Sequence, residues 1–198
     1  IFALILTMMA GIVLGMGMPT TPAYIVQVAL LVPALVNMGV SIPAAHMFVF
    51  YYAILSAITP PVAIAVYAAC GIAQSPVMAT SWVAVRLGLT GYIIPFMFVF
   101  GPSLLMIGTW TEIVLTAFSA TMGVTFLAAG LAGFLLRPTG WIARSLLVAA
   151  ALTLINPGLV TDVIGLSLGL LALFLNSRER SDAWDEENNE PRVSLNET

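Results

Sequence analysis

A pair of prolines in the middle of a long apolar run limits the fold of this chain more than any other feature. Pro60 and Pro61 follow Thr59 within the segment Ile54–Ala63. Consecutive prolines remove two backbone donors and clash with the preceding helical turn, so a helix has to break here. In hydrocarbon, such a break is tolerated only where protein encloses it or where it lines a cavity. We therefore predict a broken helix whose freed carbonyls face a ligand or an ion.

The composition places this break in a membrane. Of the 198 residues, 61% are hydrophobic and 8% are charged. Soluble domains carry about 25% charged residues. Residues 1–85 contain no Asp, Glu, Lys or Arg, and the negative net charge comes from residues 178–198. The sequence therefore predicts an all-α integral membrane protein that contacts membrane lipid, and it indicates no nucleic-acid partner.

A second segment repeats the combination of glycine, hydroxyl and proline. Gly15–Pro22 separates two apolar arms, residues 1–14 and 23–36. Fourteen helical residues reach only about 21 Å, whereas the hydrocarbon core is about 30 Å thick. We therefore predict that residues 1–36 form a re-entrant helical hairpin. Two broken apolar segments in one chain are typical of a transporter core.

The other predicted elements are bounded by Gly, Pro and Asn. Residues 1–110 form the predicted transport core, residues 111–176 add C-terminal transmembrane helices, and residues 177–198 form a disordered acidic cytoplasmic tail. The predicted helices after the hairpin are a broken transmembrane helix at 44–70, a helix near the interface at 77–87, a transmembrane helix at 90–107, a span at 112–136 and a final pair at 145–155 and 159–175.

The arginines indicate an orientation. If the hairpin opens toward one side of the membrane, the predicted spans place five arginines on the other side. Loops rich in arginine stay in the cytoplasm. We therefore predict a multi-pass protein with a cytoplasmic C-terminus and a hairpin that opens outward. These arginines are Arg86, Arg137, Arg144, Arg178 and Arg180.

The two breaks supply the candidate binding residues. Hydroxyls and freed carbonyls are hard, neutral oxygens, which suit an alkali cation such as Na⁺ better than a softer metal. We predict Thr20, Ser56 and Thr59 as Na⁺ ligands. The N-termini of the helices that restart after each break favour a carboxylate. The alternative is that both breaks are kinks packed against neighbouring helices. The complete candidate set for ion and substrate binding is Gly15, Gly17, Met18, Pro19, Thr20, Thr21, Ser56, Ala57, Thr59 and Pro60.

The remaining polar residues have structural interpretations. His46 lies near the outer end of the broken helix and is interpreted as structural, with proton coupling as the alternative. Cys70, the single cysteine, is interpreted as a packing residue. Glu112 and Asp162 lie near helix ends and are interpreted as caps. Because the sequence has no protease, esterase or Walker A motif, it predicts no enzyme, and no cofactor besides Na⁺ as a coupling ion.

Several motifs resemble a known family. Gly15–Tyr24, Ile58–Val62 and Gly71–Ala73 resemble the C-terminal half of the large permease subunit of tripartite ATP-independent periplasmic (TRAP) transporters. The resemblance covers residues 1 to about 110. The hairpin motif looks like the fused TAXI-type permease, in which Met18 holds the place that other members give to an acid.

The resemblance implies the C-terminal half of an inverted-repeat, elevator-type transporter in the inner (plasma) membrane of a bacterium or archaeon. A periplasmic solute-binding protein would deliver an organic acid, and a Na⁺ gradient would drive its import. Residues 1–36 would be the second hairpin, and Thr59–Pro61 the unwound helix of the second ion site. The N-terminal half of the permease would be the other partner, so we expect the natural polypeptide to be longer. Proton coupling, a carrier without a binding protein and a non-transporting scaffold subunit stay open as alternatives.

Overall fold

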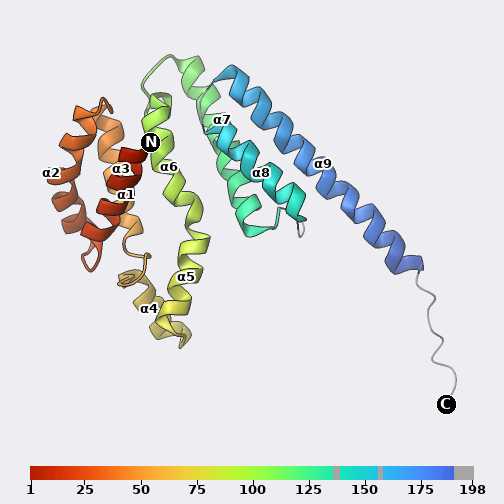
Figure 1. The fold of residues 1–198 in the computed structure, drawn as a ribbon, viewed down its shortest axis with the longest axis horizontal. Coiled ribbons are helices and arrows are strands. Elements are labelled where there is room, and N and C mark those ends of the chain that lie inside the picture. The colour runs from red at the N-terminus through yellow and green to blue at the C-terminus, as the bar shows by residue number, and fades with distance from the viewer. Residues whose placement is uncertain (136–138, 156–157, 190–198) are drawn as a thin grey trace.

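A computed structural model describes residues 1–135, 139–155 and 158–189, and these residues are mostly helical (Figure 1). The predicted all-α membrane class is confirmed. Within the described residues, two helices are long and apolar enough to cross a membrane, and a bent pair adds a third candidate span. The helices are α1 (Phe2–Gly15), α2 (Thr20–Asn37), α3 (Ile42–Leu55), α4 (Ile64–Ala73), α5 (Val77–Leu87), α6 (Leu89–Phe100), the 3₁₀ turn η1 (Pro102–Leu105), α7 (Trp110–Ala132), α8 (Trp141–Leu154) and α9 (Leu159–Asn189).

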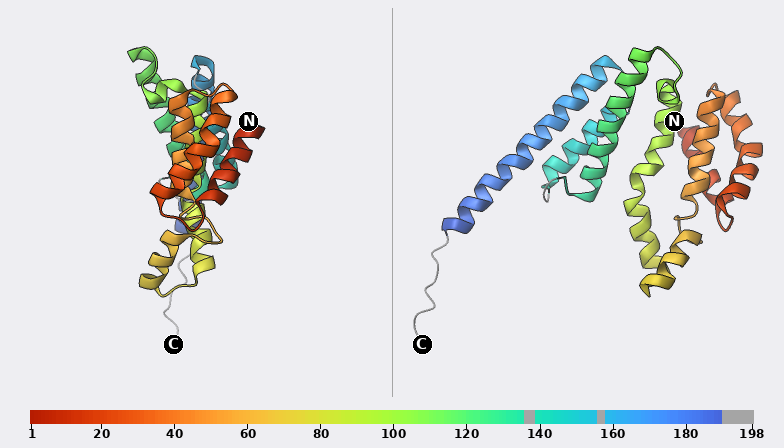
Figure 2. Two further views of the ribbon diagram at one scale, coloured as in Figure 1. Left: turned by 90° about the vertical axis from the view of Figure 1, so that its left-hand side faces the viewer. Right: turned by 180° about the vertical axis from the view of Figure 1, so that it is seen from behind.

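The helices form two groups, each with its own core. In the first group, α1, α2 and α3 bury Leu35, Phe48 and Tyr52, and α6 adds Phe96 against the Phe48 ring at 5.4 Å between centroids. In the second group, α7, α8 and α9 bury a cluster around Leu147. Figure 2 shows the two groups side by side, with α6 between the hairpin helices and α7.

Helices α1 and α2 form the predicted hairpin, but its second arm is longer than expected. α2 has 18 residues and begins at Thr20 instead of Ala23. Pro22 lies in the first turn, where a missing backbone N–H costs nothing, so it starts the helix early. At about 27 Å, α2 is a candidate membrane span by itself, and the argument from a short second arm is therefore wrong. Its re-entrant placement stays a prediction.

The broken helix lies where the prolines predict it, with a wider gap. α3 ends at Leu55 and α4 begins at Ile64, so Ser56–Ala63 forms the break. Ala63 has a left-handed backbone with φ of 38°, and the Pro60–Pro61 peptide is cis. Helix α4 ends at Ala73 rather than at residue 70 and is bent by 116° from α5.

Several predicted boundaries on the C-terminal side are wrong, including the start of α8 at Trp141 instead of residue 145, and the two largest differences are at α6 and α9. The helix predicted at 90–107 ends at Phe100, because Pro102 removes the helical conformation from the residue before it and starts a 3₁₀ turn. The tail predicted as disordered from residue 177 continues α9 as far as Asn189. Between Gly169 and Asn189 there is no Gly or Pro, so nothing in the sequence stops the helix there. Residues 190–198 lie outside the described residues.

Helix α7 begins with a capping box, as the position of Glu112 predicts. The Thr109 hydroxyl accepts a hydrogen bond from the Glu112 N–H, and the Glu112 carboxylate accepts one from the Thr109 N–H. The helix ends at Ala132, before Gly133 at a φ of 72°, and not at residue 136.

The connections gather at two ends of the molecule (Figure 1). The hairpin tip, the α4–α5 bend, the α7–α8 connection and the far end of α9 lie toward the lower end in that view. The α2–α3 connection, the α6–α7 connection and the start of α9 lie toward the upper end. The connections therefore alternate between the two ends along the chain. Arg137 lies outside the described residues, and the membrane side of each end stays a prediction.

Candidate functional site

The hairpin tip and the helix break meet at Gly15. A β-carbon at this position would overlap the Ser56 hydroxyl oxygen and would lie 2.8 Å from both Ser56 Cβ and Gln27 Nε2. Ser56 is the first residue of the break and is buried. Two residues later, a β-carbon at Gly17 would lie 3.8 Å from Val62 Cγ1, at the far end of the break. Glycine therefore allows the two interrupted segments to come into contact.

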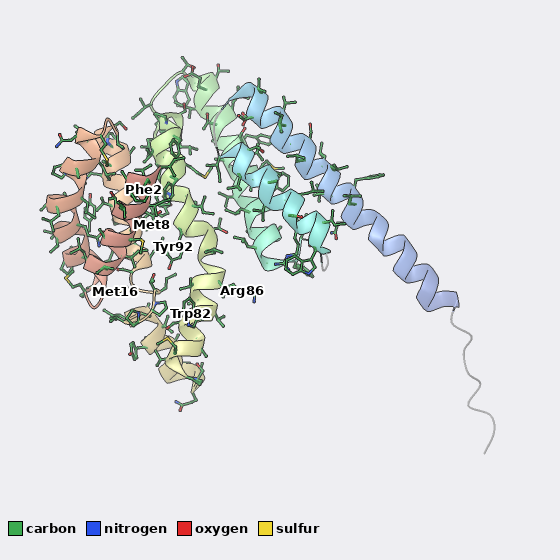
Figure 3. The ribbon with its side chains drawn as sticks, viewed as in Figure 1. Phe2, Met8, Met16, Trp82, Arg86 and Tyr92 are labelled. Carbon is green, nitrogen blue, oxygen red and sulfur yellow. The ribbon has the colours of Figure 1, made fainter. Side chains whose placement is uncertain are left out.

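A chain of hydroxyls holds the break against α6. The Thr59 hydroxyl donates to the Leu55 carbonyl at 2.6 Å. The Tyr92 hydroxyl oxygen lies 2.6 Å from Thr59 Oγ1, and because the Thr59 proton is already used, Tyr92 donates. Tyr52 of α3 in turn donates to the Tyr92 carbonyl at 2.6 Å. Figure 3 shows Tyr92 on the side of α6 that faces the hairpin helices.

The carbonyls predicted to be free at the break have backbone partners. The Ser56 carbonyl accepts from Thr59 N at 3.3 Å, and the Ala57 carbonyl accepts from Ala65 N at 3.0 Å. The prediction that the prolines leave these groups without a donor is therefore wrong, because the turn closes on itself. Each carbonyl keeps a second lone pair. The Ser56 hydroxyl donates to the Ala53 carbonyl at 2.8 Å and keeps its acceptor lone pairs as well.

The other candidate residues lie around this contact with different degrees of exposure. Thr20 is half-buried and Thr21 is exposed, both in the first turn of α2. Among the described residues, neither hydroxyl is hydrogen-bonded to Ser56 or Thr59. The structure thus brings Gly15 and Ser56 together, and it leaves the two hairpin threonines outside that contact. Of the remaining candidates, Met18, Ala57, Thr59 and Pro60 are half-buried, and Gly17 and Pro19 are exposed.

Gln27 is a residue of this site that the sequence interpretation missed. Its side chain is fully buried, and within the described part of the chain neither its Oε1 nor its Nε2 has a hydrogen-bond partner. Leaving a buried polar group unpaired costs about 1–3 kcal/mol. The amide lies against the glycine face of α1, because a β-carbon at Gly11 would be 3.2 Å from its Oε1. The sequence did contain a signal for this residue, because Gln27 is a single amide side chain in the apolar segment between Tyr24 and Asn37.

The family comparison covers this part of the chain. The family model described as Tripartite ATP-independent periplasmic transporter, DctM component, matches residues 1–113. This chain belongs to that family. The resemblance to the large TRAP component is confirmed, and the hairpin, the break and α6 all lie within the matched residues. No curated protein and no solved structure matches the chain.

This TRAP component therefore divides into a family-matched part and a remainder. The matched part ends just after α7 begins, so most of α7 and all of α8 and α9 lie outside it. The chain is a membrane-integral component of a TRAP-type secondary transporter. The TAXI-type identity suggested by the hairpin motif stays a prediction.

His46 of this TRAP component has a partner in the hairpin. The Tyr24 hydroxyl lies 2.9 Å from His46 Nδ1, and the two rings meet edge to face with centroids 6.3 Å apart. The pair joins α2 to α3 at a place separate from the Gly15–Ser56 contact. This contact supports the structural interpretation of His46 and also makes the histidine part of the link between the hairpin and the broken helix.

Proposed function

We propose that this chain forms the half of a Na⁺-coupled TRAP permease that binds ion and substrate between the hairpin tip and the helix break. The observation that carries the proposal is the contact of Gly15 with Ser56 beside the unpaired amide of Gln27. A buried amide without partners is costly in a protein that has no ligand for it. A bound ion or carboxylate would remove that cost.

The chemistry of the contact favours an alkali cation and a carboxylate. Ser56 Oγ, the second lone pairs of the break carbonyls and Gln27 Oε1 are neutral oxygens, which are ligands for a hard cation. Gln27 Nε2 and the N-terminus of α2 at Thr20 are donors that suit a carboxylate. We therefore propose an organic acid as the substrate and Na⁺ as the coupling ion, with Thr20 and Thr59 as further ligands in the loaded state.

The partners follow from the family. We propose that a periplasmic solute-binding protein delivers the organic acid, and that the N-terminal half of a TAXI-type permease completes the site. The assembly would lie in the inner membrane of a bacterium or archaeon, with the C-terminus of this chain in the cytoplasm. Elevator-type movement of the hairpin and the broken helix as one body fits the contact at Gly15, because the two segments have no space to slide past each other there.

Proton coupling is the second candidate function, and the Tyr24–His46 hydrogen bond favours it. The Tyr24 hydroxyl and His46 Nδ1 are within hydrogen-bond distance, and a proton on Nδ1 makes this nitrogen the donor and the Tyr24 hydroxyl the acceptor. The hairpin would then respond to a proton through this bond. A carrier that needs no binding protein and a non-transporting scaffold remain further alternatives that the same measurement separates.

The test is uptake of a labelled organic acid into proteoliposomes that contain the whole permease. Uptake is measured under a Na⁺ gradient, a proton gradient or neither, with and without the solute-binding protein. The variants are Ser56→Ala, Gln27→Leu and the pair Thr20→Ala with Thr59→Ala. Thr121→Ala is the matched control, because its hydroxyl also donates to a helix carbonyl but lies exposed on α7.

We expect uptake that requires both Na⁺ and the binding protein, with Na⁺ dependence lost in the site variants and kept in Thr121→Ala. Uptake driven by protons and abolished by His46→Gln would support the second candidate function instead. Uptake without the binding protein would contradict that partner. Unchanged uptake in all site variants would show that the breaks are only packed kinks.

A further inference from the structure

The C-terminal helices carry a groove that the transport site does not use. This α7–α8 groove has a volume of about 580 Å³ and is open to the surface. It lies outside the family-matched residues. Its lining residues are Gly130, Leu131, Trp141, Ile142, Arg144, Ser145, Val148, Ala149 and Leu152.

Arg144 supplies one charge to an otherwise apolar groove. Its Nε donates to the Gly130 carbonyl at 3.1 Å, and its Nη2 donates to the Leu131 carbonyl at 3.2 Å. The guanidinium lies 5.2 Å from the centre of the Trp141 ring. These contacts fix the planar group at the C-terminal end of α7 and use two of its five N–H donors. Within the described residues, no carboxylate lies within ion-pair distance of Arg144, so its charge is not neutralised.

The rest of the groove has the length and polarity of a lipid chain. Ile142, Val148 and Leu152 of α8 line the groove. From Trp141 to Leu152 the helix rises about 16 Å, close to half of the roughly 30 Å hydrocarbon core. Trp141 lies beside this arginine and is 83% exposed. Tryptophan is enriched at the interface between membrane and water.

We propose that the α7–α8 groove binds an anionic phospholipid, with the phosphate on Arg144 and one acyl chain along α8. A fixed guanidinium with free donors is the protein group that best recognises a phosphate. The apolar face below it needs an occupant that is charged at one end and hydrocarbon along its length, which a phospholipid is. The charged end lies toward the same end of the molecule as the α4–α5 bend that precedes Arg86 (Figures 1 and 3).

Quenching of Trp141 fluorescence by brominated lipids tests this proposal. The chain carries Trp82, Trp110 and Trp184 besides Trp141, and these three are replaced by Phe so that only the groove is observed. The protein is reconstituted in phosphatidylcholine, and either brominated phosphatidylglycerol or brominated phosphatidylcholine is added. We expect saturable quenching with an apparent preference of about fivefold for the anionic lipid, which corresponds to about 1 kcal/mol for one arginine near the surface.

Two variants and one control decide the outcome. Arg144→Gln removes the charge, and Ser145→Glu places a negative charge in the groove without touching the arginine's bonds to α7. Both are expected to reduce the preference to about one, whereas Arg86→Gln, an exposed arginine on α5 outside the groove, is expected to keep it. If Arg144→Gln does not fold, Ser145→Glu alone decides. Equal quenching by the two lipids in the unaltered protein, or a preference that Ser145→Glu keeps, overturns the proposal.

Discussion

At the scale of single residues, Gly15 is a position where a larger side chain has no room. A Gly15→Ala change inside a helix would ordinarily stabilise the protein by up to about 1 kcal/mol. Here the new methyl group meets the buried Ser56 side chain and the Gln27 amide, and such overpacking costs about 1–3 kcal/mol. We therefore expect a lower thermal unfolding temperature and at least tenfold slower uptake. Both are measured on purified permease and in proteoliposomes.

The control for this change is Gly71→Ala. Gly71 also lies within a helix, and a β-carbon there has nothing within 4 Å. We expect equal or greater stability and unchanged uptake. If Gly15→Ala behaved like Gly71→Ala in both measurements, the hairpin tip would not be packed on the break in the working protein.

Tyr92 is predicted to stabilise the break through its hydroxyl group alone. Tyr92→Phe removes the donor to Thr59 and leaves the ring in place, so we expect a loss of about 1 kcal/mol in stability. Thr59→Val should cost more, because it also removes the bond to the Leu55 carbonyl, and the double variant should cost less than the sum because both single changes remove the Tyr92–Thr59 bond. Denaturant or thermal unfolding of the four proteins measures this coupling. Tyr67→Phe, an exposed tyrosine on α4, should change nothing. Additive costs would contradict the direct bond.

The site residues that sequence analysis identified are those with a local signal. Gly15 and Ser56 belong to segments in which proline and glycine interrupt an apolar run, and that interruption is visible without a structure. Tyr92 gives no such signal, because its hydroxyl matters only through a partner 33 residues away. Gln27 has a weak signal, and a single polar residue in an apolar helix does not reveal what lies across from it. The carbonyl prediction at Ser56 and Ala57 was wrong because it counted lost helical bonds and not the turn bonds that replace them.

At the scale of elements, helix boundaries depended on what proline does at each position. The sequence prediction placed Pro22 in the turn between the two arms. Proline is favoured in a first helical turn, so α2 begins before Pro22, at Thr20. Pro102 has the opposite effect and ends α6 early. The acidic composition after residue 177 predicted disorder, but a helix that is already formed can continue through charged residues that have good helix propensity.

Close packing of α8 and α9 gives a prediction at this scale. A β-carbon at Gly165 would lie 2.6 Å from Leu154 Cγ and 3.0 Å from the Ala150 carbonyl, and the carbonyl belongs to the helix backbone and cannot turn away. Small residues let membrane helices approach closely, so a side chain here should force them apart. We expect Gly165→Leu to destabilise the protein by about 1–3 kcal/mol, measured by unfolding in detergent. Ser167→Leu on the exposed face of α9 is the control and should be neutral. Equal stability of the two variants would contradict the packing.

At the scale of the whole molecule, the two helix groups divide the chemistry between them. The family-matched group holds the contact of two interrupted segments, with a buried amide and hydroxyls at its centre. The C-terminal group holds no such break among its described residues, and its glycines serve close helix packing at Gly123, Gly130 and Gly165. If the first group binds the ion as proposed, the C-terminal group would be the part that stays anchored in the bilayer. The proposed lipid groove on α7 and α8 fits that division.

The arrangement of the connections predicts which positions share a side of the membrane. In a Cys70→Ala background, single cysteines replace Ser41 between α2 and α3, Ser75 between α4 and α5, and Thr139 before α8. The α4–α5 connection, which contains Ser75, and the α7–α8 connection, which contains Thr139, lie toward the same end of the molecule, and the α2–α3 connection, which contains Ser41, lies toward the other (Figure 1). Because arginine-rich connections stay in the cytoplasm, a membrane-impermeant maleimide should label Ser75→Cys and Thr139→Cys only in inside-out vesicles. Ser41→Cys should react only in right-side-out vesicles. Labelling of Ser75→Cys and Thr139→Cys from opposite sides would show that α6 and α7 do not cross the membrane as a pair, and the predicted cytoplasmic C-terminus would then be wrong as well.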